Sequence, residues 1–405
     1  MTPPGTGVDW RRRLDEAGSR MMAVVGDWLA PRDRPERSEP GMSTLVAMVA
    51  LGGGLIPILV MAVTWATRPE AGARGAACRA QSGYVLADRP AEAGYQPTDQ
   101  CNSAGSANTV ERRETGRYVV RFAGLGVSGG TAEVTPATGD DRICTLPDWQ
   151  ADGPDEIVQV DCFDRSGARA DSGFAARFVH LDGDPGAYLL SGDPGRASQT
   201  VADDYSYNSA GGTNSVDRED VGSYVAYFGR QESVLDDAVG GTVKVSAVGE
   251  SAAVCGVERW YPYPDGRYLG VRVRCRDTGG RPVDTRFAVT FSARLGSTPD
   301  DPVQGAYLWA DRASEARYTP RETYQFNAKG AANTVTRDAV GEYRVRLPGF
   351  AAESGGQVQL TAFDSPASCV VAEVARHADF HEVRVLCRAP SGAPADTPFT
   401  LQFWQ

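Results

Sequence analysis

Few side chains in this sequence combine the types and the spacing that catalysis or metal binding requires. The 405 residues include three histidines: His180, His377 and His381. On a helix, the spacing in "HADFH" would place two imidazoles on one side, as in a metal site. That segment precedes the alternating strand "EVRVLC", so we expect a hairpin loop, and no third ligand is indicated. Nucleophile-elbow, phosphate-loop and paired-carboxylate motifs are also missing from the sequence. We therefore expect no metal, no cofactor and no enzyme activity.

One aromatic segment could contact a ligand. "WYPYPDGRYLG" runs from Trp260 to Gly270 and contains Tyr261, Tyr263 and Tyr268. These tyrosines could stack on a sugar ring or a protein partner, as aromatic side chains do at interfaces. The alternative is a Pro-Gly hairpin whose aromatic rings pack on their own sheet. The sequence favours this alternative, because isolated surface aromatics are common.

Two acidic pairs could bind calcium, which prefers oxygen ligands. They are Asp182 with Asp184 and Asp300 with Asp301. No full ligand loop accompanies either pair, so solvated linkers are the preferred interpretation.

Nearly the same stretch of sequence occurs three times. The copies read "CNSAGSANTVERRETGRYVVRF" from Cys101, "YNSAGGTNSVDREDVGSYVAYF" from Tyr207 and "FNAKGAANTVTRDAVGEYRVRL" from Phe326. A downstream pattern, C-x4-G-x3-D-[ST]-x-F-x3-F, begins at Cys162, Cys275 and Cys387. Each copy has the size of a domain, which is too long for a solenoid unit.

Positions shared by all three copies are best explained by a shared fold. The recurring aspartates precede Ser or Thr and resemble turns in which the carboxylate accepts backbone N–H groups: Asp171, Asp284 and Asp396. For the recurring arginines we expect packing of the aliphatic stem: Arg112, Arg218 and Arg337. The recurring glycines are expected to supply a positive φ in a hairpin turn: Gly116, Gly222 and Gly341.

Alternating patterns such as "EYRVRL" predict half-buried antiparallel strands. Seven or eight such runs per copy, separated by turn signals, favour an all-β fold of three tandem immunoglobulin-like β-sandwich modules. The predicted modules cover residues 83–182, 183–301 and 302–405, after a linker at 68–82.

The eight cysteines all follow residue 77, and their spacing does not match a zinc site. Each copy contains one pair that we expect to form a disulfide: Cys144 with Cys162, Cys255 with Cys275 and Cys369 with Cys387. Closing each of these loops contributes roughly 3 kcal/mol in the chain-entropy model. A Cys78–Cys101 bridge would fasten the linker to the first module.

The motifs A-Y-x-W-A, Y-x-F-N-x-x-G-x-x-N-T-V-x-R and C-x4-G-x3-D-[ST]-x-F together resemble an uncharacterised repeat in exported proteins of actinobacteria and myxobacteria. The resemblance covers about residues 83–405 and is best in the third copy. It implies export but no known activity, and it carries no site residues. The first copy departs from it at Cys101, and the third has Val374 where the others have Trp149 and Trp260.

Residues 43–67 contain no charged side chain and could span a bilayer about 30 Å thick as one helix. A cleaved signal peptide is the alternative, with "AGA" at 71–73 as the cleavage site, but its apolar core would be shorter. Seven arginines lie before the span and three just after it, which predicts a cytoplasmic N-terminus and exported modules.

Within the cytoplasmic segment, 1–42, apolar residues from Trp10 to Trp28 follow helical spacing. This helix could lie on the inner membrane surface or dock a cytoplasmic partner. The formal net charge of −11 excludes a basic nucleic-acid-binding surface.

These features favour a single-pass protein of the plasma membrane that displays three modules for adhesion, recognition or spacing, with a glycan or protein ligand outside the cell. A transmembrane sensor with the N-terminal helix as its output is the alternative, and an extracellular enzyme is the third possibility.

The predicted topology can be tested with reporter fusions. A reporter at residue 5 should be active only inside the cell and one at residue 405 only outside, because the arginine bias retains the N-terminus. A mature N-terminus between Gly72 and Cys78, found by protein sequencing, would contradict an uncleaved anchor.

Overall fold

The computed structural model describes residue 78 and residues 81–182, 185–201, 203–230, 240–262, 268–293, 304–350 and 355–405. The predicted anchor (43–67) and cytoplasmic segment (1–42) lie outside these residues. Within the described ranges, no helix has the length and apolarity needed to traverse a bilayer. Residues 71–405 form one compact unit, to which the following description applies.

We call the three copies repeat 1 (83–182), repeat 2 (183–301) and repeat 3 (302–405). Repeat 1 contains β1 (Ser82–Ala87), β2 (Gly94–Tyr95), β3 (Gln100–Asn102), β4 (Thr109–Glu114), β5 (Arg117–Phe122), β6 (Thr131–Pro136), β7 (Ile143–Thr145), β8 (Trp149–Asp152), β9 (Asp155–Phe163) and β10 (Phe174–Val179). Repeat 2 contains β11 (Gly186–Ser191), β12 (Ser198–Thr200), η1 (Asp203–Tyr205), β13 (Ser206–Asn208), β14 (Asn214–Asp220), β15 (Ser223–Gly229), β16 (Thr242–Val248), β17 (Ala253–Pro262), β18 (Tyr268–Asp277) and β19 (Arg286–Ser292). Repeat 3 contains β20 (Gly305–Ala310), β21 (Arg317–Tyr318), η2 (Glu322–Tyr324), β22 (Gln325–Asn327), β23 (Thr334–Ala339), β24 (Glu342–Pro348), β25 (Gln357–Ala362), β26 (Ser368–Arg376), β27 (Phe380–Arg388) and β28 (Phe399–Trp404).

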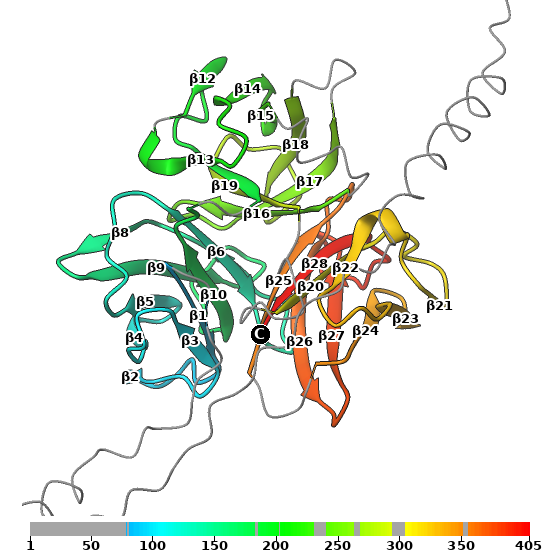
Figure 1. Ribbon diagram of the computed structural model, residues 1–405. Helices are drawn as coiled ribbons and strands as arrows, with labels where there is room; N and C mark the ends of the chain where they lie inside the picture. Colours follow the sequence, from blue (N-terminus) through cyan, green and yellow to red (C-terminus); the bar gives the residue numbers. More distant parts are fainter. Residues whose placement is uncertain are drawn as a thin grey trace, which may run out of the picture. The chain divides into compact units, whose positions relative to one another are not determined.

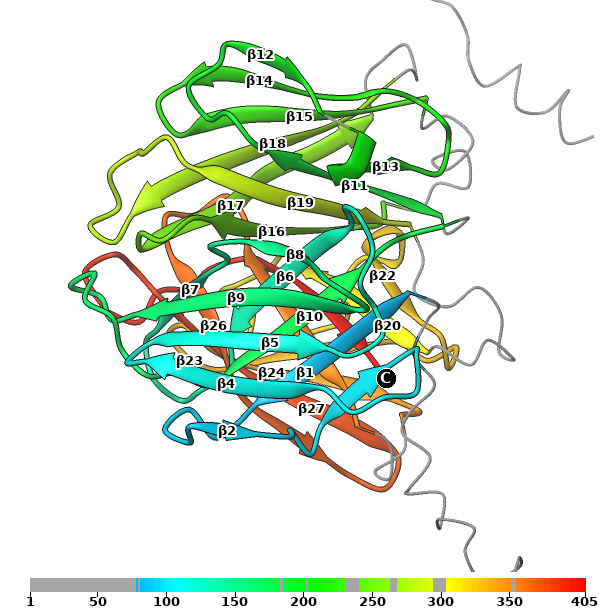
Figure 2. The ribbon, with the colours of Figure 1, turned by 90° about the vertical axis from the view of Figure 1, so that its left-hand side faces the viewer.

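Each repeat contributes two antiparallel sheets with the same strand order. The four-stranded sheets, here called inner sheets, are β3-β1-β10-β6, β13-β11-β19-β16 and β22-β20-β28-β25. The outer sheets are β2-β4-β5-β9-β7 with β8 on β9, β12-β14-β15-β18-β17, and β21-β23-β24-β27-β26. Figure 2 shows β4, β5 and β9 of the first outer sheet side by side. An all-β fold with antiparallel sheets was predicted from the alternating pattern and is confirmed.

Apolar side chains from the inner and outer sheet of each repeat form a common core. In repeat 3, Val345 and Val383 of the outer sheet join Leu308 and Leu401 of the inner sheet, and all four are fully buried. Burying one such side chain contributes about 1.5–3 kcal/mol. The alternation in "EYRVRL" therefore identifies its buried face correctly, and Arg344 points to solvent.

The edge strands of the three inner sheets, β6, β16 and β25, contact one another (Figure 1). An edge strand leaves backbone N–H and C=O groups without ladder partners. Here each edge donates one N–H to a hydroxyl of another repeat. The three bonds run from Val134 N to Ser246 Oγ (3.2 Å), from Val245 N to Thr361 Oγ1 (3.1 Å) and from Leu360 N to Thr135 Oγ1 (3.0 Å).

Three short parallel bridges join the repeats at matching positions. They pair Leu146 with Val248, Val257 with Phe363, and Ala137 with Val371. Repeat 1 thus contacts repeat 2, repeat 2 contacts repeat 3, and repeat 3 contacts repeat 1. The contacts form a closed cycle of three similar interfaces.

Lys244 lies at the centre of this cycle. Its Nζ donates hydrogen bonds to Val134 O in repeat 1 (2.9 Å) and to Leu360 O in repeat 3 (2.8 Å). These carbonyls belong to the other two edge strands, so one side chain of repeat 2 satisfies backbone groups of both neighbours. Burial lowers the pKa of Lys244 from 10.5 to about 7, and the Glu133 carboxylate opposes this shift.

Lys244 should make stability depend on pH. Its pKa is about 7 in the folded chain and 10.5 as the reference value. Between these values the unfolded chain binds more protons, so the free energy of unfolding should rise from pH 7 toward pH 10. We expect Lys244→Met to lose this rise, whereas Lys329→Met should keep it. Urea unfolding at pH 7 and pH 9.5 measures the difference, and an unchanged rise in Lys244→Met would contradict the assignment.

Candidate functional site

The recurring residues of each repeat gather into one hydrogen-bonded cluster, here called the Arg–Asp latch. In repeat 2, the Arg218 guanidinium donates through Nε and Nη2 to the two Asp284 carboxylate oxygens, at 3.0 and 2.7 Å. Gly222 N and the Tyr224 hydroxyl also donate to Asp284 Oδ1, at 2.9 and 2.8 Å. The matching latches are Arg112, Gly116, Tyr118 and Asp171 in repeat 1, and Arg337, Gly341, Tyr343 and Asp396 in repeat 3.

The latch explains why a glycine recurs in the hairpin. Gly222 has φ +63°, and a Cβ there would lie 2.4 Å from Cys275 O. Only glycine fits this conformation and this close approach. The positive φ predicted for the three recurring glycines is confirmed.

The charges of the latch also stabilise one another. The Arg218 guanidinium lowers the pKa of Asp284 from 3.8 to about 2. The predicted hydrogen bond from a backbone N–H to the aspartate is present, from Gly222 N to Asp284 Oδ1. For the arginine, the sequence predicted only packing of the aliphatic stem, which is incomplete. Its head forms a bidentate ion pair with Asp284, and its stem does not act by packing alone. Because all three repeats carry the latch, we assign it to the fold.

The histidines are not arranged for metal binding. His377 stacks on Phe380 in the β26–β27 hairpin, with ring centroids 4.2 Å apart. His381 is fully buried near Phe350 and Phe403. Over the described part of the chain, no group of His, Cys, Asp or Glu could hold a metal ion. Asp182 is exposed there, whereas Asp184, Asp300 and Asp301 lie outside the described residues.

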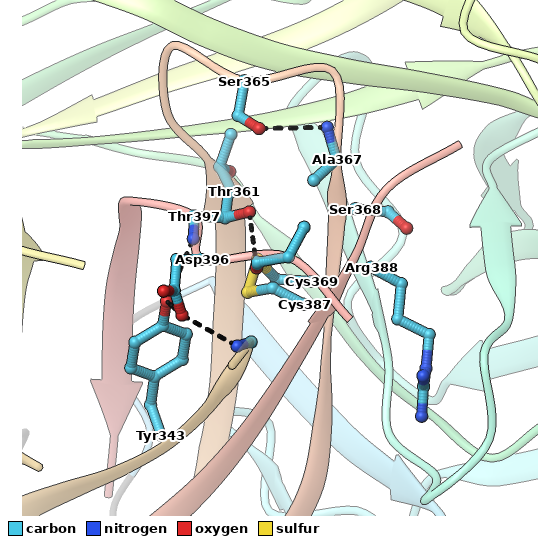
Figure 3. The surroundings of a disulfide bond; sticks show 12 residues. Tyr343, Thr361, Ser365, Ala367, Ser368, Cys369, Cys387, Arg388, Asp396 and Thr397 are labelled. Carbon is cyan, nitrogen blue, oxygen red and sulfur yellow. Dashed lines mark hydrogen bonds between the residues drawn. A yellow bond between two sulfur atoms is a disulfide. The ribbon is translucent and has the colours of Figure 1, made fainter. Parts of the chain in front are cut away.

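All four predicted disulfides are present in the structure. Figure 3 shows Cys369–Cys387 with Asp396 and Tyr343 of the latch nearby. Within each repeat the bonded cysteines are direct cross-strand partners in the outer sheet: Cys144 with Cys162, Cys255 with Cys275, and Cys369 with Cys387. Immunoglobulin domains instead link their two sheets, so the predicted immunoglobulin-like character does not extend to the disulfide.

Two of the three candidate tyrosines, Tyr261 and Tyr268, lie where β17 ends and β18 begins. Tyr268 is 42% exposed and meets Tyr227 edge-on, with ring centroids 6.1 Å apart. Tyr261 is half-buried, and Arg259 lies over its ring at 4.9 Å. Tyr263 lies outside the described residues. The rings therefore contact their own sheet in part, while Tyr268 remains accessible. Sequence analysis missed Tyr227, which pairs with Gly270 on the neighbouring strand.

Three arginines continue this surface along β18 at alternating positions: Arg272, Arg274 and Arg276. Arg272 pairs with Glu219 at 2.7 Å and Arg274 with Glu258 at 2.5 Å. Arg276 donates through Nη1 to Gly280 O, but its Nε has no hydrogen-bond partner. We call this surface the Tyr–Arg face, made of Tyr227, Arg259, Tyr261, Tyr268, Arg272, Arg274 and Arg276.

A pocket of about 400 Å³ adjoins the Tyr–Arg face where repeat 2 meets repeat 3. Glu258, Arg274 and Arg276 line one side of it. Asp364 and Ser365 of repeat 3 line the other. The contact between the repeats therefore creates a charged hollow at the arginine end of β18.

The tryptophans absent from repeat 3 belong to the contacts between repeats. Trp260 packs against Trp309, Tyr324 and Phe363 of repeat 3, with centroids 5.5–5.6 Å away. Trp149 similarly meets Tyr205 of repeat 2 at 5.9 Å. Where repeat 3 meets repeat 1, the salt bridge of Arg376 with Asp99 crosses the interface. The interface between repeats 3 and 1 therefore has a salt bridge, whereas the other two interfaces have tryptophan contacts.

Comparison of the chain with protein-family models, curated proteins and solved structures finds no match.

The latch predicts a stability loss that depends on pH. Asp284→Asn should lower the free energy of unfolding at pH 7 by about 1–3 kcal/mol, the usual cost of a lost charged hydrogen bond. The folded pKa of Asp284 is about 2 against a reference of 3.8, so its contribution disappears as pH falls through this range. Urea unfolding at pH 7 and pH 2 should show the deficit shrinking. The exposed control Asp182→Asn should show no deficit, and an Asp284→Asn deficit independent of pH would contradict the ion pair.

Proposed function

We propose that the three repeats are β-sandwich modules that act together as one extracytoplasmic recognition head. In this proposal residues 43–67 anchor the head in the plasma membrane and residues 1–42 remain in the cytoplasm. The closed cycle of contacts between repeats supports recognition over spacing, because a spacer needs no contact between its first and last modules. Four disulfides support an oxidising compartment.

The Tyr–Arg face is the proposed ligand-binding surface, and it is the observation that carries this function. Tyrosine rings stack on sugar rings, and arginine forms bidentate hydrogen bonds with carboxylates. The face combines both kinds of side chain: Arg272 and Arg274 are paired with glutamates, whereas Arg259 is exposed and lies over Tyr261. We therefore propose that the ligand is a glycan with acidic groups.

Repeat 3 provides an internal comparison for this surface. Tyr268 pairs with Gly229, and Phe380 occupies the matching position beside Pro348. Phe380 is engaged by its neighbours, because His377 stacks on it and Arg346 lies 3.7 Å from its ring centre. The two hairpins share the same strand pairing, but Tyr268 is exposed whereas Phe380 is covered by His377 and Arg346.

The tyrosines should matter more for binding than for folding. In the full-length chain held in lipid nanodiscs, Tyr261→Ala with Tyr268→Ala should weaken binding to an acidic glycan at least tenfold. The reason is that losing a stacking aromatic costs about 1–3 kcal/mol, and 1.4 kcal/mol is a factor of ten. Binding is measured by calorimetry after a glycan-array screen.

Phe380→Ala is the matched control and should leave glycan binding unchanged. The melting temperature of the double tyrosine variant should change little, since Tyr268 is exposed. A fall of several degrees with unchanged glycan binding would assign these tyrosines to packing and remove the proposed site.

A further inference from the structure

A second pocket lies on the axis where the three repeats meet, away from the Tyr–Arg face. It measures about 60 Å³ and is lined by residues of all three repeats. Thr135, Ser246 and Thr361, which accept the hydrogen bonds between edge strands, form part of its wall. The lining also includes the half-buried Arg142 and Val254, so the pocket reaches the surface.

The pocket is rich in hydrogen-bond donors. Lys244 Nζ has three protons when charged and donates to two carbonyl oxygens, which leaves one N–H for a further acceptor. Ser246 Oγ and Thr361 Oγ1 each accept a backbone N–H, so each hydroxyl proton can still be donated. Three donors from two repeats therefore border the same small space.

Within the described residues Lys244 forms no salt bridge, although the buried Glu133 carboxylate is close enough to raise its pKa. Its two bonds are to neutral carbonyl groups. The nearby Glu133 forms its salt bridge with Arg177, at 3.4 Å. A buried ammonium group is costly unless an opposite charge accompanies it. Glu133 is shared with Arg177, and an anion in the pocket would add a direct ion pair to the Lys244 ammonium group.

Two aspartates near the pocket are paired with arginines, whereas Glu133 Oε1 has no hydrogen-bond partner. Asp141 forms a bidentate pair with Arg165, at 2.5 and 2.7 Å. Asp140 lies 3.6 Å from Arg142, which is itself part of the lining. These pairings reduce the repulsion that an entering anion would meet.

We propose that the axial pocket binds a carboxylate group, with Lys244 as the counter-charge and with Ser246 and Thr361 as hydrogen-bond donors to its oxygens. A volume of about 60 Å³ accommodates a carboxylate but not a sugar ring. The group can belong to a small free acid or to the terminal carboxylate of an extended chain that enters through the mouth. This site is independent of the proposed glycan surface.

The test uses the full-length chain in nanodiscs and ¹³C-acetate as the probe. Wild-type protein should broaden the acetate signal in a saturable manner, and so should Lys329→Met, which changes the only other lysine. Lys244→Met should weaken acetate binding at least tenfold. The double variant Ser246→Ala, Thr361→Ala should also weaken acetate binding. This double variant tests the proposal if Lys244→Met does not fold.

Competition separates the two sources of the carboxylate. A short peptide with a free C-terminal carboxylate should displace acetate, whereas the same peptide with an amidated C-terminus should not. Displacement at a peptide concentration far below that of acetate would identify a chain end, and equal potency would identify a small free acid. Absence of saturable broadening in the wild type, or unchanged acetate binding in a folded Lys244→Met, would overturn the proposal. Either result leaves the glycan measurement on the Tyr–Arg face unaffected.

Discussion

The three inner sheets all end in an edge strand, and a buried edge must find partners for its backbone groups. Side chains of other repeats provide them. The hydroxyls of Thr135, Ser246 and Thr361 accept the N–H groups, while Lys244 donates to carbonyls on two edges. Separating the repeats would expose these groups and leave apolar side chains such as Trp260 without their neighbours. The arrangement of the repeats therefore follows from satisfying three sheet edges at once.

This arrangement determines what the surface can present. The contact of repeat 2 with repeat 3 buries Trp260 and leaves the opposite side of β17 and β18 as the Tyr–Arg face. The same contact forms the charged hollow beside Arg276. The latches act within repeats, where each ties the hairpin of an outer sheet to the segment that enters the inner sheet. Framework and candidate sites thus occupy different residues, which allows one to be altered without the other.

Much of the fold could be predicted from the sequence, because alternation and repetition are local patterns. Strands such as β24 and the cysteine pairs followed directly from them. The Arg–Asp latch could not be derived, since Arg218 and Asp284 are 66 positions apart and nothing local shows which charges meet. The contacts between repeats were missed because hydroxyl residues on a strand usually indicate solvent. One signal was present: Thr135, Ser246 and Thr361 stand at nearly the same distance before the first cysteine of each pair. Among the site residues, Tyr261 and Tyr268 were identified, whereas Tyr227 and the arginines of β18 required the sheet register.

Hydrogen exchange at the backbone amides of Val134, Val245 and Leu360 tests the central claim most directly. In separate modules these amides would lie on open edges and exchange quickly. If the three edges are closed by hydroxyls of other repeats, they should exchange as slowly as amides inside a sheet, such as that of Val345. Protection at all three positions is the predicted result. Exchange at the rate of an unprotected edge, in a chain whose sheet cores remain protected, would contradict the account.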